Sequence, residues 1–172
     1  MPELVRIDLP GMGSGFTLRQ LDRYLRVEHM EFPAVDGRVW LFRGMAQLHD
    51  FLATDPHWRD LVGLDHRELD PERATRYDLW QMVDGTLRWG TGDEAGPCSD
   101  LCVELAFHTG SMEVLDELGP GLGDLYGVMD ARTWRRIMPI LVSLLRFWDE
   151  PDRPVDPDAV HEAINASFFH SP

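Results

Sequence analysis

The chain has 172 residues, of which 44% are hydrophobic and 27% are charged, and its formal net charge is -14 at pH 7. This composition is ordinary for a globular protein and too apolar for a disordered one, and the length predicts a single domain over residues 1–172. All 16 basic residues are arginines, and the lack of lysine excludes Schiff-base catalysis, pyridoxal phosphate attachment and Walker-type phosphate loops.

The acidic charge also restricts the partners that we expect. Binding to nucleic acid or to an anionic membrane begins with basic side chains that neutralise phosphates. The net charge of -14 therefore predicts that the chain binds neither. Two interpretations of the acidity stay open: it keeps the protein soluble, or it forms a surface that attracts a basic protein partner.

The N-terminal residues predict that the protein stays in the cytoplasm. Charged residues at positions 3, 6 and 8 interrupt the segment where a signal peptide needs an apolar run. No stretch reaches the roughly 18 apolar residues that a membrane-spanning helix requires. Cys98 and Cys102 are the only cysteines, so we expect no disulfide framework and two reduced thiols.

The first elements in chain order are a strand, a turn and a helix. Residues 4–9 alternate in hydrophobicity, which predicts a half-buried strand. The glycine-rich run over residues 10–15 favours a flexible turn over a phosphate-binding loop, because no lysine supports a phosphate there. Thr17 and Gln20 have the spacing of a capping box, which predicts a helix over residues 18–27.

A hairpin and three short helices are predicted next. Residues 32–42 place Asp36-Gly37, a dipeptide typical of two-residue hairpin turns, between two apolar runs, and Pro33 predicts an edge strand. Apolar residues at helical spacing then predict two short helices between residues 45 and 63. Asp70-Pro71 is a further helix start.

A second hairpin is predicted around Asp84-Gly85, with strands over residues 79–83 and 86–89. In this register Trp80 lies opposite Trp89 on one face of the hairpin, while Arg88 lies on the other face. A helix over residues 71–83 stays open as the alternative.

The C-terminal half is predicted to be mainly helical. Residues 101–107 alternate and predict a strand, and Ser111 caps a short helix. An apolar stripe predicts a central helix over residues 130–148, kinked at Pro139, and a last helix begins at Asp156-Pro157. We expect an α+β fold: a small, mostly antiparallel sheet with hairpins, packed against several helices, and a helical C-terminal third.

Glu104, His108 and His49 are the candidate catalytic residues. On the predicted strand Glu104 faces the same side as Cys102, and His108 follows at its end, so a carboxylate and an imidazole line one polar edge as acid and base. His49 adds a group that titrates near neutrality. The alternative is that these side chains lie on a covered or solvated face.

Cys98, Cys102 and His108 also suggest a zinc site. A strand advances about 3.3 Å per residue, which would separate Cys102 from His108 by roughly 20 Å. A helical turn over residues 98–102 would align the thiols, but a zinc site would still need two more ligands. We therefore predict no metal and no cofactor.

Trp80, Trp89 and Arg88 are the candidate binding residues, since tryptophan and arginine are enriched at interface hot spots. With the acidic stretch over residues 149–158, they favour a cytoplasmic binding or regulatory protein, such as an inhibitor or immunity-type factor, with a basic partner. The alternative function is a small enzyme, without lysine or metal, that uses Glu and His as acid and base on a small molecule.

Overall fold

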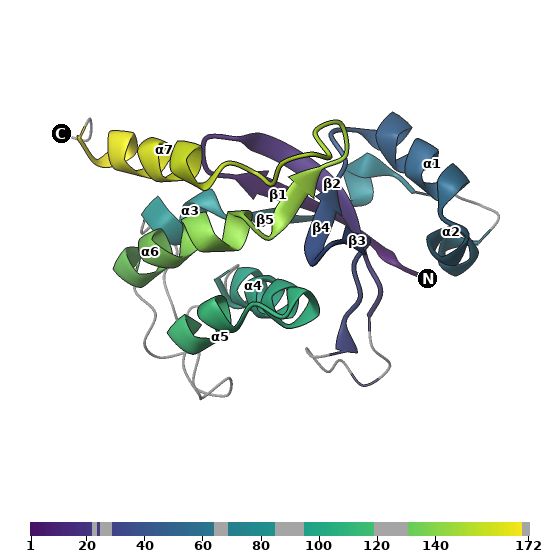
Figure 1. Cartoon of the computed structure of the whole chain (residues 1–172), viewed down its shortest axis with the longest axis horizontal. Coiled ribbons are helices and arrows are strands. Elements are labelled where there is room, and N and C mark those ends of the chain that lie inside the picture. The colour runs from purple at the N-terminus through teal and green to yellow at the C-terminus, as the bar shows by residue number, and fades with distance from the viewer. Residues whose placement is uncertain (22–23, 25–28, 64–68, 85–94, 119–130, 170–172) are drawn as a thin grey trace.

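The computed structural model describes residues 1–21, 24, 29–63, 69–84, 95–118 and 131–169. They form an α+β fold, as the sequence predicts, with two three-stranded sheets and helices on both sides of them (Figure 1). The first sheet has the order β2-β1-β5 and the second has the order β3-β4-β6. The strands are β1 (Glu3–Leu9), β2 (Gly13–Arg19), β3 (Ala34–Val35), β4 (Arg38–Leu41), β5 (Thr75–Asp78) and β6 (Leu145–Phe147).

Each sheet is mixed, with one antiparallel and one parallel pair of strands. β1 is antiparallel to β2 and parallel to β5, and β4 is antiparallel to β3 and parallel to β6. The two sheets meet where β2 approaches the end of β4. There the backbone amides of Phe16 and Phe42 each donate a hydrogen bond to the carbonyl of the other residue, over 2.7 and 2.8 Å.

The helices are α1 (Met45–Thr54), α2 (Pro56–Val62), α3 (Trp80–Asp84), α4 (Ala95–Thr109), α5 (Met112–Leu118), α6 (Ala131–Val142) and α7 (Pro157–Phe169), with a 3-10 turn, η3, at Pro71–Arg73. Figure 1 shows α1 and α2 at one end of the molecule and α3, α6 and α7 at the other. Among the described residues, no helix has the length and apolar character needed to cross a membrane.

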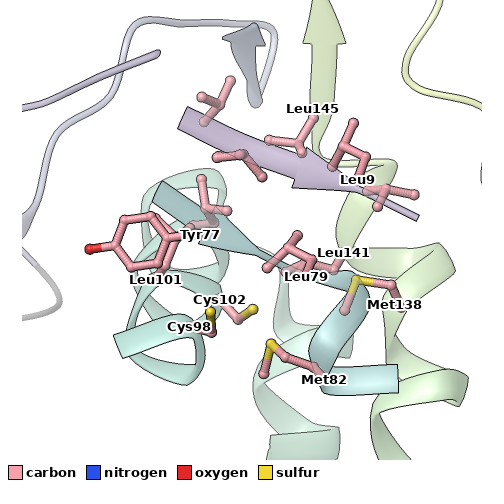
Figure 2. Close-up of a cluster of buried hydrophobic side chains, with 14 of the residues drawn as sticks. Leu9, Tyr77, Leu79, Met82, Cys98, Leu101, Cys102, Met138, Leu141 and Leu145 are labelled. Atoms are coloured by element: carbon pink, nitrogen blue, oxygen red, sulfur yellow. The ribbon is translucent and has the colours of Figure 1, made fainter. Parts of the chain in front are cut away.

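Alternating side chains on the strands separate two hydrophobic cores. From β1, Val5 and Ile7 point into the larger core and Leu4 into the smaller one; β4 divides Leu41 and Trp40 in the same way. Residues of α3, α4, α6 and α7 complete the larger core, part of which Figure 2 shows, and residues of α1 and α2 complete the smaller one. This period of two is what a sheet covered on both faces requires.

Several predicted elements are confirmed. Asp36 and Gly37 form a two-residue turn with positive φ angles of 50° and 70°, which the hairpin turn needs and which glycine adopts without strain. The two short helices after it are α1 and α2, and Asp55 caps α2 by accepting a hydrogen bond from the Trp58 amide. The predicted starts at Ser111 and Asp156-Pro157 are also observed, in α5 and α7.

The helix predicted over residues 18–27 is wrong at its start, because Leu18 and Arg19 belong to β2; residues 22–23 and 25–28 lie outside the described residues. Gly11 and Gly13 have φ angles of 72° and 76°, so the chain reverses there and residues 13–19 pair with β1 along their whole length. Seven paired residues outweigh a local capping pattern.

The strand predicted over residues 101–107 is also wrong, since this segment lies in α4. Residues 101–106 of α4 are all buried, on every side of the helix. A helix buried all round shows no single apolar stripe, so its apolar residues also match a period of two.

Two further corrections concern α3 and α6. The strand predicted over residues 79–83 is wrong because Trp80 begins α3, its amide bonded to the Asp78 side chain; the partner strand at residues 86–89 lies outside the described residues. The long helix predicted over residues 130–148 ends at Val142, with Pro139 inside it, and Leu145–Phe147 continues as β6.

The burial of Leu141 gives a test of this core. Leu141 is fully buried in the larger core, so Leu141→Ala should lower the free energy of unfolding by about 2 to 5 kcal/mol in urea denaturation. Met112 is 63% exposed, so Met112→Ala should change the free energy of unfolding by less than about 0.5 kcal/mol. Equal effects of the two substitutions would contradict the placement of α6.

Candidate functional site

A buried ion-pair cluster joins the first sheet to α4. Arg19, at the end of β2, donates from Nη1 to Glu104 Oε2 over 2.9 Å, and from Nε and Nη2 to Glu3 Oε2 over 3.0 and 2.6 Å. Its guanidinium lies 5.4 Å from the centre of the Tyr77 ring. The side chains of Arg19 and Glu104 are only 10% and 6% exposed, so each charge depends on the other for its stability.

Burial sets the electrostatics of this cluster. It raises the pKa of Glu104, which the Arg19 guanidinium partly offsets. Burial opposes the charge of Arg19, but Glu104 and Glu3 outweigh it and raise the pKa of Arg19 above its ordinary value. Burial likewise raises the pKa of Tyr77. Glu104 is therefore held as an ion-pair partner, which does not suit it to exchange protons with a ligand.

An open cleft of about 690 Å³ lies at the C-terminal end of α4. Three elements form it: the segment over residues 29–34, the start of α2, and the last turn of α4. We call it the histidine cleft, because three of its lining residues are histidines. It is lined by His29, Met30, Glu31, Phe32, Ala34, Asp55, His57, Trp58, Phe107 and His108.

Hydrogen bonds of two kinds, a backbone bridge and a helix cap, fix the two walls of the histidine cleft. Gln20 and Glu31 form an isolated antiparallel bridge, with amide-to-carbonyl distances of 2.9 and 3.1 Å, which extends the direction of β2 and holds the segment over residues 29–32. On the other wall, the Asp55 cap positions the first turn of α2, so that His57 projects at the rim.

His108 is the most buried of the three histidines. Its ring lies edge-on to Phe32, with ring centres 5.6 Å apart. Burial lowers the pKa of His108, while Glu31 and hydrogen bonds with the backbone of Met30 and Phe32 act in the opposite direction. His108 thus favours the neutral imidazole more strongly than an exposed histidine does.

The rim of the cleft carries an imidazole beside a carboxylate. His57 Nε2 lies 3.7 Å from Glu31 Oε2, and both side chains are more than half exposed. Protonated His57 forms an ion pair with Glu31, whereas neutral His57 leaves that carboxylate available. The arrangement is able to bind a charged ligand or to exchange protons with a small one.

The predicted site residues do not meet in one place. Glu104 pairs with Arg19, His108 lines the cleft one helical turn further along α4, and His49 is exposed on α1 and does not line the cleft. Trp80 is half-buried against the larger core. Trp89 and Arg88 lie outside the described residues.

Cys98 and Cys102 lie on one side of α4, as a helical turn requires, and both are buried beside Leu101 (Figure 2). Burial raises the pKa of the Cys102 thiol well above its ordinary value, which favours the protonated and unreactive form. Within the described ranges, no three His, Cys, Asp or Glu side chains are placed to hold a metal ion.

Sequence reasoning missed the cleft as a unit. His57, Glu31 and Asp55 belong to no catalytic or ligand-binding motif in the sequence. The Asp55-Pro56 helix start does predict that His57 lies in a first turn. No pattern in the sequence indicates that this turn faces residues 29–34 and the end of α4, since those contacts join segments far apart in the chain.

Comparison with known proteins gives a fold and no family. No family model matches the chain, and no curated protein matches it. The fold is similar to the crystal structure of the SatS C-terminal domain in complex with bromine, with a TM-score of 0.56 and 16% sequence identity. The match covers 85% of this chain and 93% of that one. At this identity the likeness shows a shared fold alone.

The Arg19–Glu104 pair makes a pH-dependent prediction. Arg19→Met should lower the free energy of unfolding at pH 7 by about 3 to 5 kcal/mol, because it leaves buried Glu104 without a cation. Folded Glu104 then holds its proton more tightly than the unfolded chain does, so the stability of the variant falls as pH rises above about 4.3 and recovers on acidification.

Urea denaturation at several pH values measures this effect. Arg73→Met is the matched control: Arg73 pairs with Asp70 on the surface and is 88% exposed, so its loss should change the free energy of unfolding by less than about 1 kcal/mol. Adding Glu104→Gln to Arg19→Met should restore part of the loss. A loss independent of pH would contradict the role given to the Glu104 charge.

Proposed function

We propose that this chain is a cytoplasmic binding or regulatory protein, such as an inhibitor or immunity-type factor, and that it engages a basic protein partner through its acidic surface. The support is electrostatic. A net charge of -14 creates a negative field that attracts basic proteins and speeds their association at low ionic strength.

The observation that carries the proposal is how the arginines are used. Most arginines of the described ranges form ion pairs with carboxylates of this same chain, which leaves the excess carboxylates unopposed at the surface. These internal pairs are Arg6 and Arg76 with Asp8, Arg19 with Glu3 and Glu104, Arg43 with Asp149, Arg59 with Asp60, Arg73 with Asp70, Arg136 with Glu117, and Arg153 with Glu150.

The acidic stretch over residues 149–158 contributes less negative charge to the surface than its composition indicates. Asp149 and Glu150 contact Arg43, so their charge is partly neutralised within the chain. Asp152 and Glu162 are exposed and have no arginine partner among the described residues. The surface therefore supplies long-range attraction from several places, and we assign it to steering of the partner.

Affinity capture tests the proposal. Immobilised full-length chain is incubated with lysate of the source cells at low and at raised ionic strength, and retained proteins are identified by mass spectrometry. We expect a stoichiometric protein with an excess of Lys and Arg that is lost as salt rises, because exposed charges are screened within about 10 Å at 0.1 M salt. Retention of no basic protein at low salt would overturn the proposal.

The histidine cleft favours a second candidate function, a small metal-free enzyme that acts on a small molecule. Its volume of about 690 Å³ is within the range of small-molecule sites, and the His57–Glu31 pair lies at its rim. In this reading His57 and His108 replace the predicted Glu104–His108 pair as acid and base, since Arg19 holds Glu104.

A small molecule that copurifies with the protein would identify this function. Protein purified under native conditions is denatured, and the released small molecules are measured by mass spectrometry against a His57→Gln/His108→Gln variant. The enzyme function predicts a metabolite in stoichiometric amount that the variant loses. Release of nothing from either protein, with a basic protein captured as above, would reject it.

A further inference from the structure

We propose that the histidine cleft receives an arginine side chain of the basic partner, and that protonation of its histidines expels that side chain. The inference deepens the proposed function and rests on it. The overall charge alone specifies neither where the partner binds nor how binding depends on pH, and the histidine cleft supplies both.

Two carboxylates on separate elements face the cleft. Glu31 comes from the segment over residues 29–34 and Asp55 from the start of α2. Asp55 uses Oδ1 for the helix cap, and among the described residues neither carboxylate pairs with an arginine of this chain. A guanidinium matches such acceptors, because it presents several N–H donors in one plane and remains charged at all relevant pH values.

One aromatic ring of the lining suits the same ligand. Phe107 lines the cleft and is half-buried, whereas Trp58 and Phe32 are 5% and 2% exposed and form its floor. Guanidinium groups stack on aromatic rings more readily than ammonium groups do, so two carboxylates beside the Phe107 ring favour arginine over a simple cation. A metal ion fits less well, because no three ligating side chains of the described ranges converge there.

The histidines give the cleft its own competing cation. His57 Nε2 is 3.7 Å from Glu31 Oε2, so protonated His57 occupies the carboxylate that the incoming guanidinium needs. His29 and His108 line the same space. Of the other charged groups on α2 and α4, Arg59 lies 3.9 Å from Asp60 and Glu104 bonds Arg19, while Asp100 lies near the other end of α4 and does not line the cleft.

The sign of the pH response follows from these groups. With neutral imidazoles, the two carboxylates make the cleft negative, which attracts a guanidinium. Histidine side chains in general gain positive charge on acidification between about pH 8 and 5, and a proton on the His57 imidazole places that charge 3.7 Å from Glu31 Oε2. Binding of a cation should weaken, whereas binding of an anionic small molecule should strengthen.

The experiment uses a fluorescent arginine octapeptide and the full-length chain at low ionic strength. At about pH 7.5, Glu31→Gln/Asp55→Asn should weaken binding about tenfold or more, because it removes both carboxylates that accept hydrogen bonds from the guanidinium. The matched control, Asp152→Asn/Glu162→Gln, removes the same charge from exposed positions outside the cleft. It should weaken binding by less than about threefold.

The pH arm compares wild type with His57→Gln. We expect the affinity of wild type for the peptide to fall about tenfold from about pH 7.5 to 5.5. The affinity of His57→Gln should change much less over the same range. Asn caps a helix as well as Asp does, so Asp55→Asn should fold. If a melting curve shows that the double variant does not, Glu31→Gln alone carries the test, because that side chain is 54% exposed.

The outcomes separate this inference from the function on which it rests. If the peptide binds and both double variants weaken it equally, the peptide senses only the overall charge, and the cleft assignment fails while the proposed function stands. Tighter peptide binding at about pH 5.5 would also overturn the assignment. If wild type binds neither the peptide nor any basic protein at low salt, both proposals fail.

Discussion

The pairing of β2 with β1 is the constraint on which most of this structure depends. Along its length β2 fixes two other parts of the fold, the second sheet and α4. Phe16 bonds the end of β4 and so joins the two sheets, while Arg19 binds Glu104 and so docks α4. Gly15 allows β2 to approach the second sheet, because a Cβ at this position would lie 2.9 Å from Leu41 Cβ. A helix at residues 18–19 would break the pairing of Arg19 with Glu3 on β1 and so the position from which Arg19 reaches α4.

The same strand places the histidine cleft. Gln20, directly after β2, pairs with Glu31 and holds the segment over residues 29–32. Arg19, its neighbour, anchors α4, whose last turn presents His108 to that segment. The cleft therefore lies between elements that β2 positions, and α2 closes it through the Asp55 cap. Its geometry follows from the β1–β2 pairing more than from any residue that lines it.

Charge links the fold to the proposed function. Arginine is the only strong cation of this chain, and most described arginines form ion pairs within it. Internal pairing reduces repulsion among the carboxylates and concentrates the remaining negative charge at the surface. In the cleft, histidine takes the place that arginine has elsewhere.

The sequence by itself determined several local elements and the overall class of the fold. The Asp36-Gly37 turn, the cap at Asp55, the start at Asp156-Pro157 and the α+β class were all readable, because each depends on residues a few positions apart. The acidity and the lack of lysine were equally plain.

Only the tertiary structure decided the state of β2, α4 and β6 and the grouping of the cleft. β2 pairs where a capping pattern favoured a helix. Residues 101–106 of α4 are buried on every side and so show no periodic stripe, and β6 follows the apolar run of α6 but pairs with β4. The sequence around Glu104 favours a catalytic acid. In the structure Glu104 instead pairs with Arg19, which is 85 residues away in the sequence. The physical reason is shared: these states are set by long-range pairing and burial, which outweigh local preference and leave no pattern in the neighbouring residues.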